Sequence, residues 1–354
     1  MEDSPQNPEQ PVRKRRVRYQ GTHPRRFEEK YKEHNPEKYA ADVEKVLKSG
    51  QTPAGMHRPI LVKEVLEVLM PQAGQTGVDA TLGYGGHTRE LLQKIRPSGR
   101  LFALDVDPVE IVKTEKRLRS LGYSENELII RRMNFAGIPK LLSEVSGGFD
   151  FILADLGVSS MQLDNPARGF TFKWEGPLDL RLNPERGQSA AALIKTVTPS
   201  ALEKILWVNS DEPHAALLAQ AICEKRGEIT TTTALADAIR RALTPVLRKV
   251  PNPENEMTKS IRRTFQALRI QVNDEFSALE QFMRNLPVCL KAGGRAAILT
   301  FHSGEDSRVI KFLTEGHEAG IYSAFNSEPV RPNYEECYNN PRAKSAMLRW
   351  AVRA

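Results

Sequence analysis

The sequence predicts an α/β fold with a mostly parallel sheet and helices on both faces. One observation is that short apolar runs alternate with amphipathic helical stretches from Val78 to Asp155, giving a β-α-β-α-β-α-β series. This alternation is typical of parallel sheets that are covered on both faces. A second observation is that the apolar runs end in glycines or polar residues, at the edge of the sheet where ligands bind in such folds.

The most informative stretch is a strand, a glycine turn, a helix and a second strand. The apolar run Val78 to Leu82 leads into the turn Gly83–Gly86, and helical spacing of leucines and isoleucine predicts a helix from His87 to Ile95. The strand Leu101 to Leu104 then ends on Asp105. Glycines let the backbone approach a ligand at a helix N-terminus, and a carboxylate at the tip of the neighbouring strand can bind two ribose hydroxyls. The stretch therefore predicts a nucleoside site.

The turn also restricts the kind of nucleoside. Its pattern is G-x-G-G-x-T, so the third glycine of a dinucleotide fingerprint is missing, and no G-K-[ST] follows to bind a triphosphate. The turn by itself is equally consistent with a tight connection between strand and helix. Its combination with Asp105 favours a nucleoside.

Length, charge and cysteine content limit the class of protein to which the chain can belong. With 354 residues the chain is long enough for one large domain or two, and its net charge of +7 favours a polyanionic partner such as nucleic acid. Cys223, Cys289 and Cys337 lie far apart, so we expect reduced packing residues and neither a disulfide nor a metal site. No apolar run approaches the roughly 20 residues of a membrane span, and no signal peptide is evident. We therefore expect a cytoplasmic protein without membrane contact.

The first 55 residues look like an extension of the globular part. Pro11 to Arg26 carries seven basic residues and no acidic one. Two interpretations are open, a solvated disordered tail or an arm that binds phosphates. A short helix is expected from Ala40 to Leu47, and the apolar face of a later helix, from about Val62 to Leu69, leads into the glycine-turn stretch.

Between Met161 and Pro253 the alternation gives way to several helices, which we interpret as an insertion in the α/β domain. The expected core residues of this insertion are Leu206, Trp207, Leu217, Leu218 and Ile222. The sheet is then expected to resume after one long helix from Arg263 to Leu290. The elements predicted after that helix are a stop at Gly293-Gly294, a strand from Ala296 to Phe301 that ends in His302, a helix from Glu305 to Leu313, and antiparallel strands near the C-terminus. This order is typical of a methyltransferase sheet.

Eight segments from residue 81 onward closely resemble the MraW/RsmH family of ribosomal RNA small subunit methyltransferases. They are TLGYGGHT (81–88), LDVDP (104–108), DLGVSSMQLD (155–164), RGFTF (168–172), GPLDLRL (176–182), RTFQALRIQVN (263–273), TFHSGEDSRV (300–309) and NPRAKSAMLR (340–349). The resemblance implies a class I methyltransferase fold with a mostly parallel seven-stranded sheet. The domains would be a basic extension (1–55), a discontinuous methyltransferase domain (56–160 and 256–354) and a helical insertion (161–255) that recognises the substrate.

The resemblance further implies S-adenosylmethionine-dependent N4-methylation of one cytidine in the decoding region of small-subunit ribosomal RNA. The RNA would be methylated within the small ribosomal subunit, and a homodimer is left open. The family's cofactor contacts fall on seven positions of this sequence: Gly85, Gly86, His87, Asp105, Phe135, Asp155 and Gln162. No metal ion is implied. The open alternatives are a methyltransferase that acts on DNA or protein, and a ribosome-assembly factor that only holds the cofactor.

A cytosine amine is a poor nucleophile, so the reaction needs a group that accepts its N–H bonds and later its proton. Asp155, at the end of the fourth strand, is our candidate for this acceptor. The Asp/Asn-Pro-Pro-aromatic motif of amino-methylating DNA enzymes is absent after it. His302 is a candidate general base or, more simply, a structural histidine. The base must leave its stack, and the stacking candidates, which core packing explains equally well, are Phe170, Phe172 and Trp174.

Overall fold

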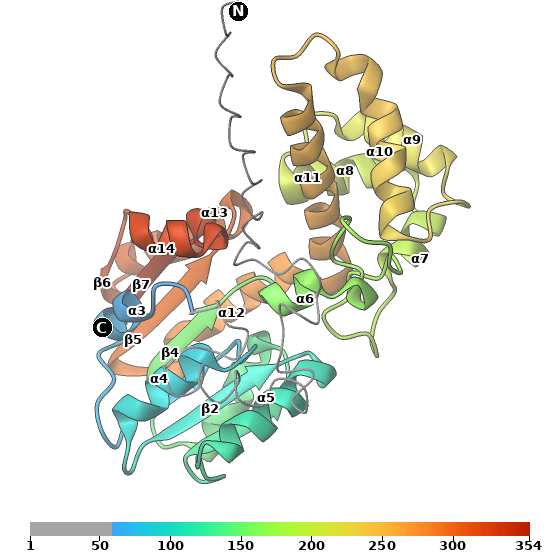
Figure 1. The fold of residues 1–354 in the computed structure, drawn as a ribbon. Coiled ribbons are helices and arrows are strands. Elements are labelled where there is room, and N and C mark those ends of the chain that lie inside the picture. Colours follow the sequence, from blue (N-terminus) through green and yellow to red (C-terminus); the bar gives the residue numbers. More distant parts are fainter. Residues whose placement is uncertain (1–58) are drawn as a thin grey trace, which may run out of the picture.

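The computed structural model describes residues 59–354, which form an α/β sheet domain and a helical unit beside it (Figure 1). Seven strands make one sheet in the order β3-β2-β1-β4-β5-β7-β6. The strands are β1 (Thr76–Asp79), β2 (Arg100–Asp105), β3 (Leu128–Arg132), β4 (Phe149–Asp155), β5 (Leu290–Thr300), β6 (Tyr322–Phe325) and β7 (Met347–Arg353). Strands β1 to β5 pair in parallel, whereas β7 is antiparallel to both β5 and β6. The mostly parallel seven-stranded sheet is therefore confirmed.

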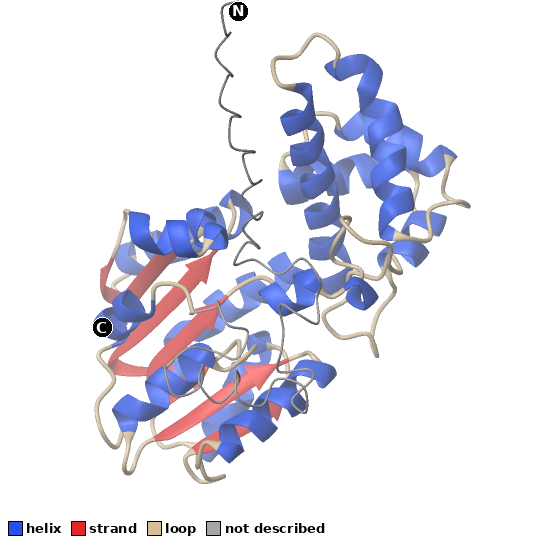
Figure 2. Cartoon of the chain, in the orientation of Figure 1, coloured by secondary structure: helices blue, strands red, loops and turns tan. Residues whose placement is uncertain are grey.

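Helices cover both faces of the sheet (Figure 2). Neighbouring residues of β2 point to opposite sides, so Leu101 packs in one apolar cluster and Phe102 in another, and both side chains are fully buried. The first cluster includes residues of α3 (Val62–Leu69), α4 (Gly86–Ile95) and α5 (Pro108–Ser120). The second includes residues of η2 (Phe135–Glu144), α12 (Glu275–Cys289) and α13 (Ser303–Glu318). Burial on both faces explains why these strands are almost continuously apolar.

The helical unit has its own apolar core. Its helices are α7 (Ala190–Thr196), α8 (Pro199–Ser210), α9 (Ala215–Glu224), α10 (Thr232–Leu247) and α11 (Pro253–Asn273). Leu206, Leu218 and Ile222 are buried there as expected. The prediction was wrong for Trp207, which is 59% exposed, and for Leu217, which is 39% exposed. Trp207 directly follows the buried Leu206 and Leu217 directly precedes the buried Leu218, and one step along a helix turns a side chain by about 100° away from the buried stripe.

The long helix predicted from Arg263 to Leu290 is in fact two helices. Helix α11 ends at Asn273, Asp274 adopts a left-handed conformation with φ of 52°, and α12 begins at Glu275. This single residue redirects the chain from the helical unit to the sheet. The predicted domain boundary after residue 255 falls inside α11, whose buried residues Ile261, Phe265 and Leu268 belong to the core of the helical unit.

Gly293 and Gly294 do not stop the chain before the fifth strand, as the sequence predicts, but lie within β5. The register between β4 and β5 shifts between Phe149 and Phe151. Gly293 has φ of 74°, and a Cβ at Gly294 would lie 3.0 Å from the carbonyl oxygen of Phe149. The glycines therefore permit an irregularity inside a strand, which is a common use of glycine in sheets.

The remaining predictions concern the N-terminal segment, membrane-spanning helices and the cysteines. The basic segment Pro11 to Arg26 and the helix expected from Ala40 to Leu47 lie outside the described residues. In residues 59–354, no helix combines the length and apolarity needed to span a bilayer. All three cysteines carry free thiols, and those of Cys223 and Cys289 are buried.

Candidate functional site

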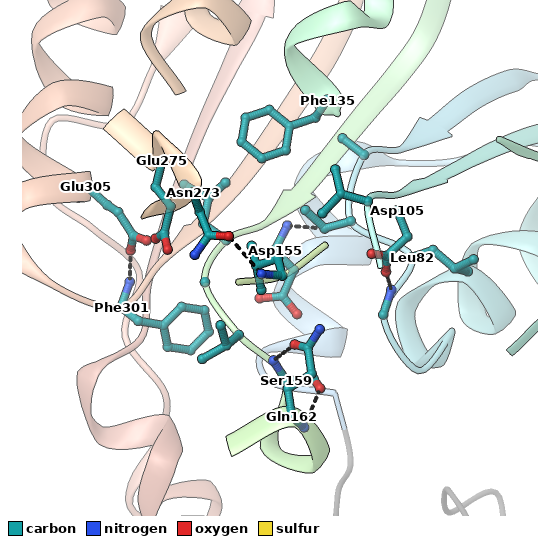
Figure 3. Close-up of a pocket in the computed structure, with 18 of the residues that line it drawn as sticks. Leu82, Asp105, Phe135, Asp155, Ser159, Gln162, Asn273, Glu275, Phe301 and Glu305 are labelled. Atoms are coloured by element: carbon teal, nitrogen blue, oxygen red, sulfur yellow. Dashed lines mark hydrogen bonds between the residues drawn. The ribbon is translucent and has the colours of Figure 1, made fainter. Parts of the chain in front are cut away.

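The carboxyl ends of β1, β2, β3 and β4 meet at one edge of the sheet and open into a cavity of about 430 Å³. The predicted site residues that line it are Gly86, His87, Asp105, Phe135, Asp155 and Gln162. Gly85 precedes them in the turn but is not a lining residue. Figure 3 shows Asp105 on one side of the cavity, Glu275 and Glu305 on the other, and Asp155 between them. The structure thus brings together strand ends that the sequence placed at one edge.

The glycine turn between β1 and α4 is held tightly. Gly83 and Gly85 have positive φ angles of 48° and 76°, a region that glycine enters without strain. A Cβ at Gly86 would lie 2.3 Å from the ring of Pro59, so only glycine fits there. The N-cap residue of α4 is Gly85, which has no side chain that could cap the helix, and no other side chain of residues 59–354 does so. Its first N–H groups therefore remain at the cavity wall, where the helix dipole favours a negative group.

Asp79, at the end of β1, holds this turn in place through hydrogen bonds on both sides of it. Its side chain is 1% exposed, and it accepts hydrogen bonds from the hydroxyl of Thr88 at 2.6 Å and from the N–H of Thr81 at 3.1 Å. Burial raises the pKa of Asp79. The bonds tie the end of the strand to the first turn of α4 and keep the uncapped helix end in place.

Asp105, at the end of β2, faces the cavity with both carboxylate oxygens. Oδ2 accepts the N–H of Gly83 at 2.8 Å, and Oδ1 accepts the N–H of Asp107 at 2.9 Å. Burial raises the pKa of Asp105 to about 6, although these two N–H groups favour the anion. A carboxylate offers roughly four lone-pair sites, so each oxygen can still accept one hydroxyl. The carboxylate thus supplies two acceptors side by side, which match the two hydroxyl donors of a ribose diol.

Asp155 and His87 form an ion pair in the wall. His87 Nδ1 lies 3.4 Å from Asp155 Oδ2, and its Nε2 lies 3.0 Å from the carbonyl oxygen of Ile60. Both ring nitrogens face acceptors, which suits the doubly protonated imidazolium. Burial alone would lower the pKa of His87, but the hydrogen bond and charge of Asp155, together with Asp79, raise it. The imidazole of His87 therefore lies beside the Asp155 carboxylate at the end of β4.

Gln162 belongs to a buried polar network behind the cavity. Its Oε1 accepts the N–H of Ser159, and its Nε2 donates to Asp107 at 2.7 Å. Asp107 is fully buried, caps α5, and also accepts from Arg168 at 2.6 Å. Nη2 of Arg168 also donates a hydrogen bond to the carbonyl oxygen of Leu182 at 2.9 Å. The network thus connects the end of β2 with the loop that leads into the helical unit.

The opposite wall is charged, and sequence reasoning did not identify it. Arg269 on α11 pairs with both oxygens of Glu275 on α12 at 2.8 Å. Glu305 accepts the N–H of Phe301 at 2.8 Å. Burial alone would raise the pKa of Glu305, but His302, Arg269 and that N–H lower it. The closeness of Arg269 and Glu275 in the sequence was the one available signal, because the break between their helices is not visible in the sequence pattern.

His302 caps α13, because its Nδ1 accepts the N–H of Glu305 at 3.3 Å. This is the structural role that we weighed against a general base. Asn273, which also lines the cavity, accepts the N–H of Leu182 at 2.7 Å and donates to the carbonyl oxygen of Leu180 at 2.8 Å. The last residue of α11 therefore holds the loop that enters the helical unit.

The aromatic candidates separate into two groups. Phe135 is half-buried in the cavity wall and makes an edge-to-face contact with Phe282, with centroids 5.4 Å apart. Phe170 is buried in the helical unit, and Phe172 packs on Phe265 at 5.5 Å. Trp174 is 56% exposed. These last three lie outside the cavity lining, so packing accounts for Phe170 and Phe172.

The cavity fits an adenosyl group that carries an amino acid. Asp105 offers acceptors for the ribose hydroxyls, Phe135 a flat apolar face for the base, and the uncapped end of α4 donors for a carboxylate. In the part of the chain that the structure describes, no three metal-ligating side chains gather in one place. The strand order, together with acids at the ends of β2 and β4, defines a class I methyltransferase.

Comparison with known proteins agrees with this class. The model of the MraW methylase family matches residues 54–354. The chain is 54% identical over 357 residues to ribosomal RNA small subunit methyltransferase H 1 of Lachnoclostridium phytofermentans, covering 99% of this chain and 96% of the relative. It is 37% identical over 319 residues to ribosomal RNA small subunit methyltransferase H of Halorhodospira halophila, covering 85% and 95%. The chain belongs to the MraW methylase family.

Proposed function

We propose that this protein transfers a methyl group from S-adenosylmethionine to N4 of one cytidine in the decoding region of small-subunit ribosomal RNA. The observation that carries the proposal is a cavity of about 430 Å³ at the strand ends whose lining includes the carboxylates of Asp105 and Asp155. The name of the relatives that share more than half of the sequence supports the RNA substrate. The target is presented within the small ribosomal subunit, which places the enzyme in the cytoplasm.

On this proposal the glycine turn and the ends of β2 and β3 hold the cofactor. Asp105 accepts both ribose hydroxyls, Phe135 contacts the adenine, and Gly85, Gly86 and His87 present the start of α4 to the methionine carboxylate. Gln162 holds the wall beside the ribose through Asp107. The cofactor, when bound, supplies a methyl group on a sulfonium, which leaves readily.

Asp155 is the proposed acceptor for the cytosine amine. Accepting the N–H bonds of that amine localises its lone pair, and the same carboxylate can take the proton that the methylated amine releases. His87 is a positioning residue, because its Nδ1 lies 3.4 Å from Asp155 Oδ2 and its Nε2 is fixed by the carbonyl oxygen of Ile60. Orientation of amine and cofactor supplies the remaining rate enhancement.

The test uses small subunits from a strain that lacks this modification, incubated with the protein and labelled S-adenosylmethionine. Mass spectrometry of the digested RNA should locate N4-methylcytidine at one position, and deproteinised RNA in parallel should react less. The variant Asp155→Asn should lose at least about 100-fold in turnover at saturating S-adenosylmethionine. Asp237→Asn, which changes an exposed aspartate, is the matched control. Label in DNA or protein instead of RNA would contradict the substrate, and normal turnover of Asp155→Asn would contradict the acceptor.

A further inference from the structure

Arg342 lies on η4 (Pro341–Ser345), a short turn in the NPRAKSAMLR segment that the proposed mechanism does not use. Its backbone N–H donates to the side chain of Asn340 at 3.2 Å. The flanking residues Ala343 and Ala346 are fully buried. The turn is therefore anchored on both sides, and Arg342 is held at a fixed place in the cavity lining.

Of the two terminal nitrogens of the Arg342 guanidinium, one is hydrogen-bonded and the other is not. Nη2 donates to Asp164 of α6 (Ser160–Asp164) at 2.7 Å. Nη1 is buried and has no hydrogen-bond partner within residues 59–354. Arg269, the other arginine that lines the cavity, instead commits Nε and Nη2 to the two oxygens of Glu275. An unpaired buried N–H is unfavourable, so Nη1 is a donor for which a bound molecule would supply the acceptor.

The charges of the cavity indicate the kind of acceptor. Carboxylates of Asp105, Asp155 and Glu305 line its walls, whereas Glu275 and Arg269 neutralise each other as a pair. An RNA strand that brings a base into this cavity carries phosphates, which these carboxylates repel. The side chain of Arg342 is 35% exposed as a whole, but Nη1 itself is buried, so a ligand reaches this nitrogen only when the guanidinium turns toward it. The methionine carboxylate of the cofactor already has donors at the uncapped start of α4.

We propose that Arg342 Nη1 binds a phosphate oxygen of the RNA strand next to the target cytidine. The inference rests on the proposed function and adds a contact that selects a nucleotide within a strand over a free nucleoside. Asp164 engages the guanidinium only through Nη2, which leaves Nη1 for the phosphate oxygen. Charge-assisted hydrogen bonds from arginine to phosphate are among the stronger polar contacts in proteins.

The test compares Arg342→Gln with Lys344→Gln, which removes the same charge from an exposed position of the same turn. Arg342→Gln should raise KM for the RNA substrate about tenfold. It should also reduce the slope of log K against log salt by about 0.7, the value for one single-strand phosphate contact. The dissociation constant of S-adenosylhomocysteine should stay unchanged. Lys344→Gln should change KM less than about twofold, since an isolated surface charge contributes little.

Asp164→Asn provides a second comparison, because it breaks the same ion pair but leaves the cation of Arg342 in place. It should retain most of the RNA affinity. The proposal is overturned if Asp164→Asn loses as much as Arg342→Gln, if Lys344→Gln has an equal effect, or if Arg342→Gln weakens binding of S-adenosylhomocysteine, since the anion would then be the cofactor's carboxylate. Failure of the proposed function would look different, because the unchanged protein would not methylate ribosomal RNA at all.

Discussion

Ionisation of Asp105 should control the affinity for the cofactor near pH 6. Burial raises its pKa from 3.8 to about 6, and the ionised carboxylate is the form that accepts two hydroxyls. At pH 5 a group with this pKa is ionised in about one molecule in eleven. The dissociation constant of S-adenosylhomocysteine should therefore be about tenfold higher at pH 5 than at pH 7.5, equal to about 1.4 kcal/mol. The ligand's own carboxyl and amino groups, with pKa values of roughly 3.5 and 8, change charge little between pH 5 and pH 7, where most of this change in affinity falls.

Isothermal titration calorimetry between pH 5 and pH 8 measures this dependence directly. Asp105→Asn is the control, because its amide can still accept one of the two backbone N–H groups but does not ionise; its affinity should be low and independent of pH. A constant affinity of the unchanged protein from pH 5 to pH 7.5 would refute the reasoning. A pH dependence that survives in Asp105→Asn would assign the titration to another group.

The same pKa shift has a defined sign for stability. Because the folded-state pKa of Asp105 lies above its unfolded value, its contribution favours folding fully below pH 3.8 and is lost as the pH rises through about 6. At neutral pH the buried, ionised Asp105 therefore lowers the stability of the ligand-free fold, although this ionised form is the one that binds the ligand. Ligand binding offsets that cost, since the diol replaces the water that burial removed.

Three further perturbations test the packing around the site. Arg168→Met should lower the free energy of unfolding by about 3–5 kcal/mol, because it leaves the fully buried Asp107 without its cation; urea unfolding measures the loss, and an unchanged midpoint would contradict it. Gly86→Ala should abolish binding of S-adenosylhomocysteine, since its Cβ meets a proline ring. Leu206→Ala should cost about 2–5 kcal/mol and Trp207→Ala far less, and equal losses would contradict the observed burial.

The cofactor side of the site could be predicted because its determinants are local in sequence. The glycine turn and Asp105 follow strands whose apolar pattern is unmistakable, and parallel strands bring their ends together by geometry alone. Asp155 was placed by the same rule. The contact between His87 and Asp155 depends on the side-chain direction at the start of α4, which no periodicity specifies.

The opposite wall could not be predicted, because it depends on tertiary contacts. Helical periodicity continues through Asp274. Only the left-handed conformation of that residue in the structure ends α11 and turns the chain so that Arg269 and Glu275 can pair. The exposure of Trp207 follows from the packing of α8 against neighbouring helices, whereas composition alone favoured burial. Arg342 contacts Asp164 across 178 positions of the sequence, a pairing that no local pattern contains.

A crystal structure of the protein with S-adenosylhomocysteine would test the central claim most directly. The account predicts the adenosine across the ends of β1, β2 and β3, with both ribose hydroxyls within hydrogen-bond distance of Asp105 and the sulfur facing Asp155. A ligand bound elsewhere, or a ribose whose hydroxyls do not contact Asp105, would contradict it.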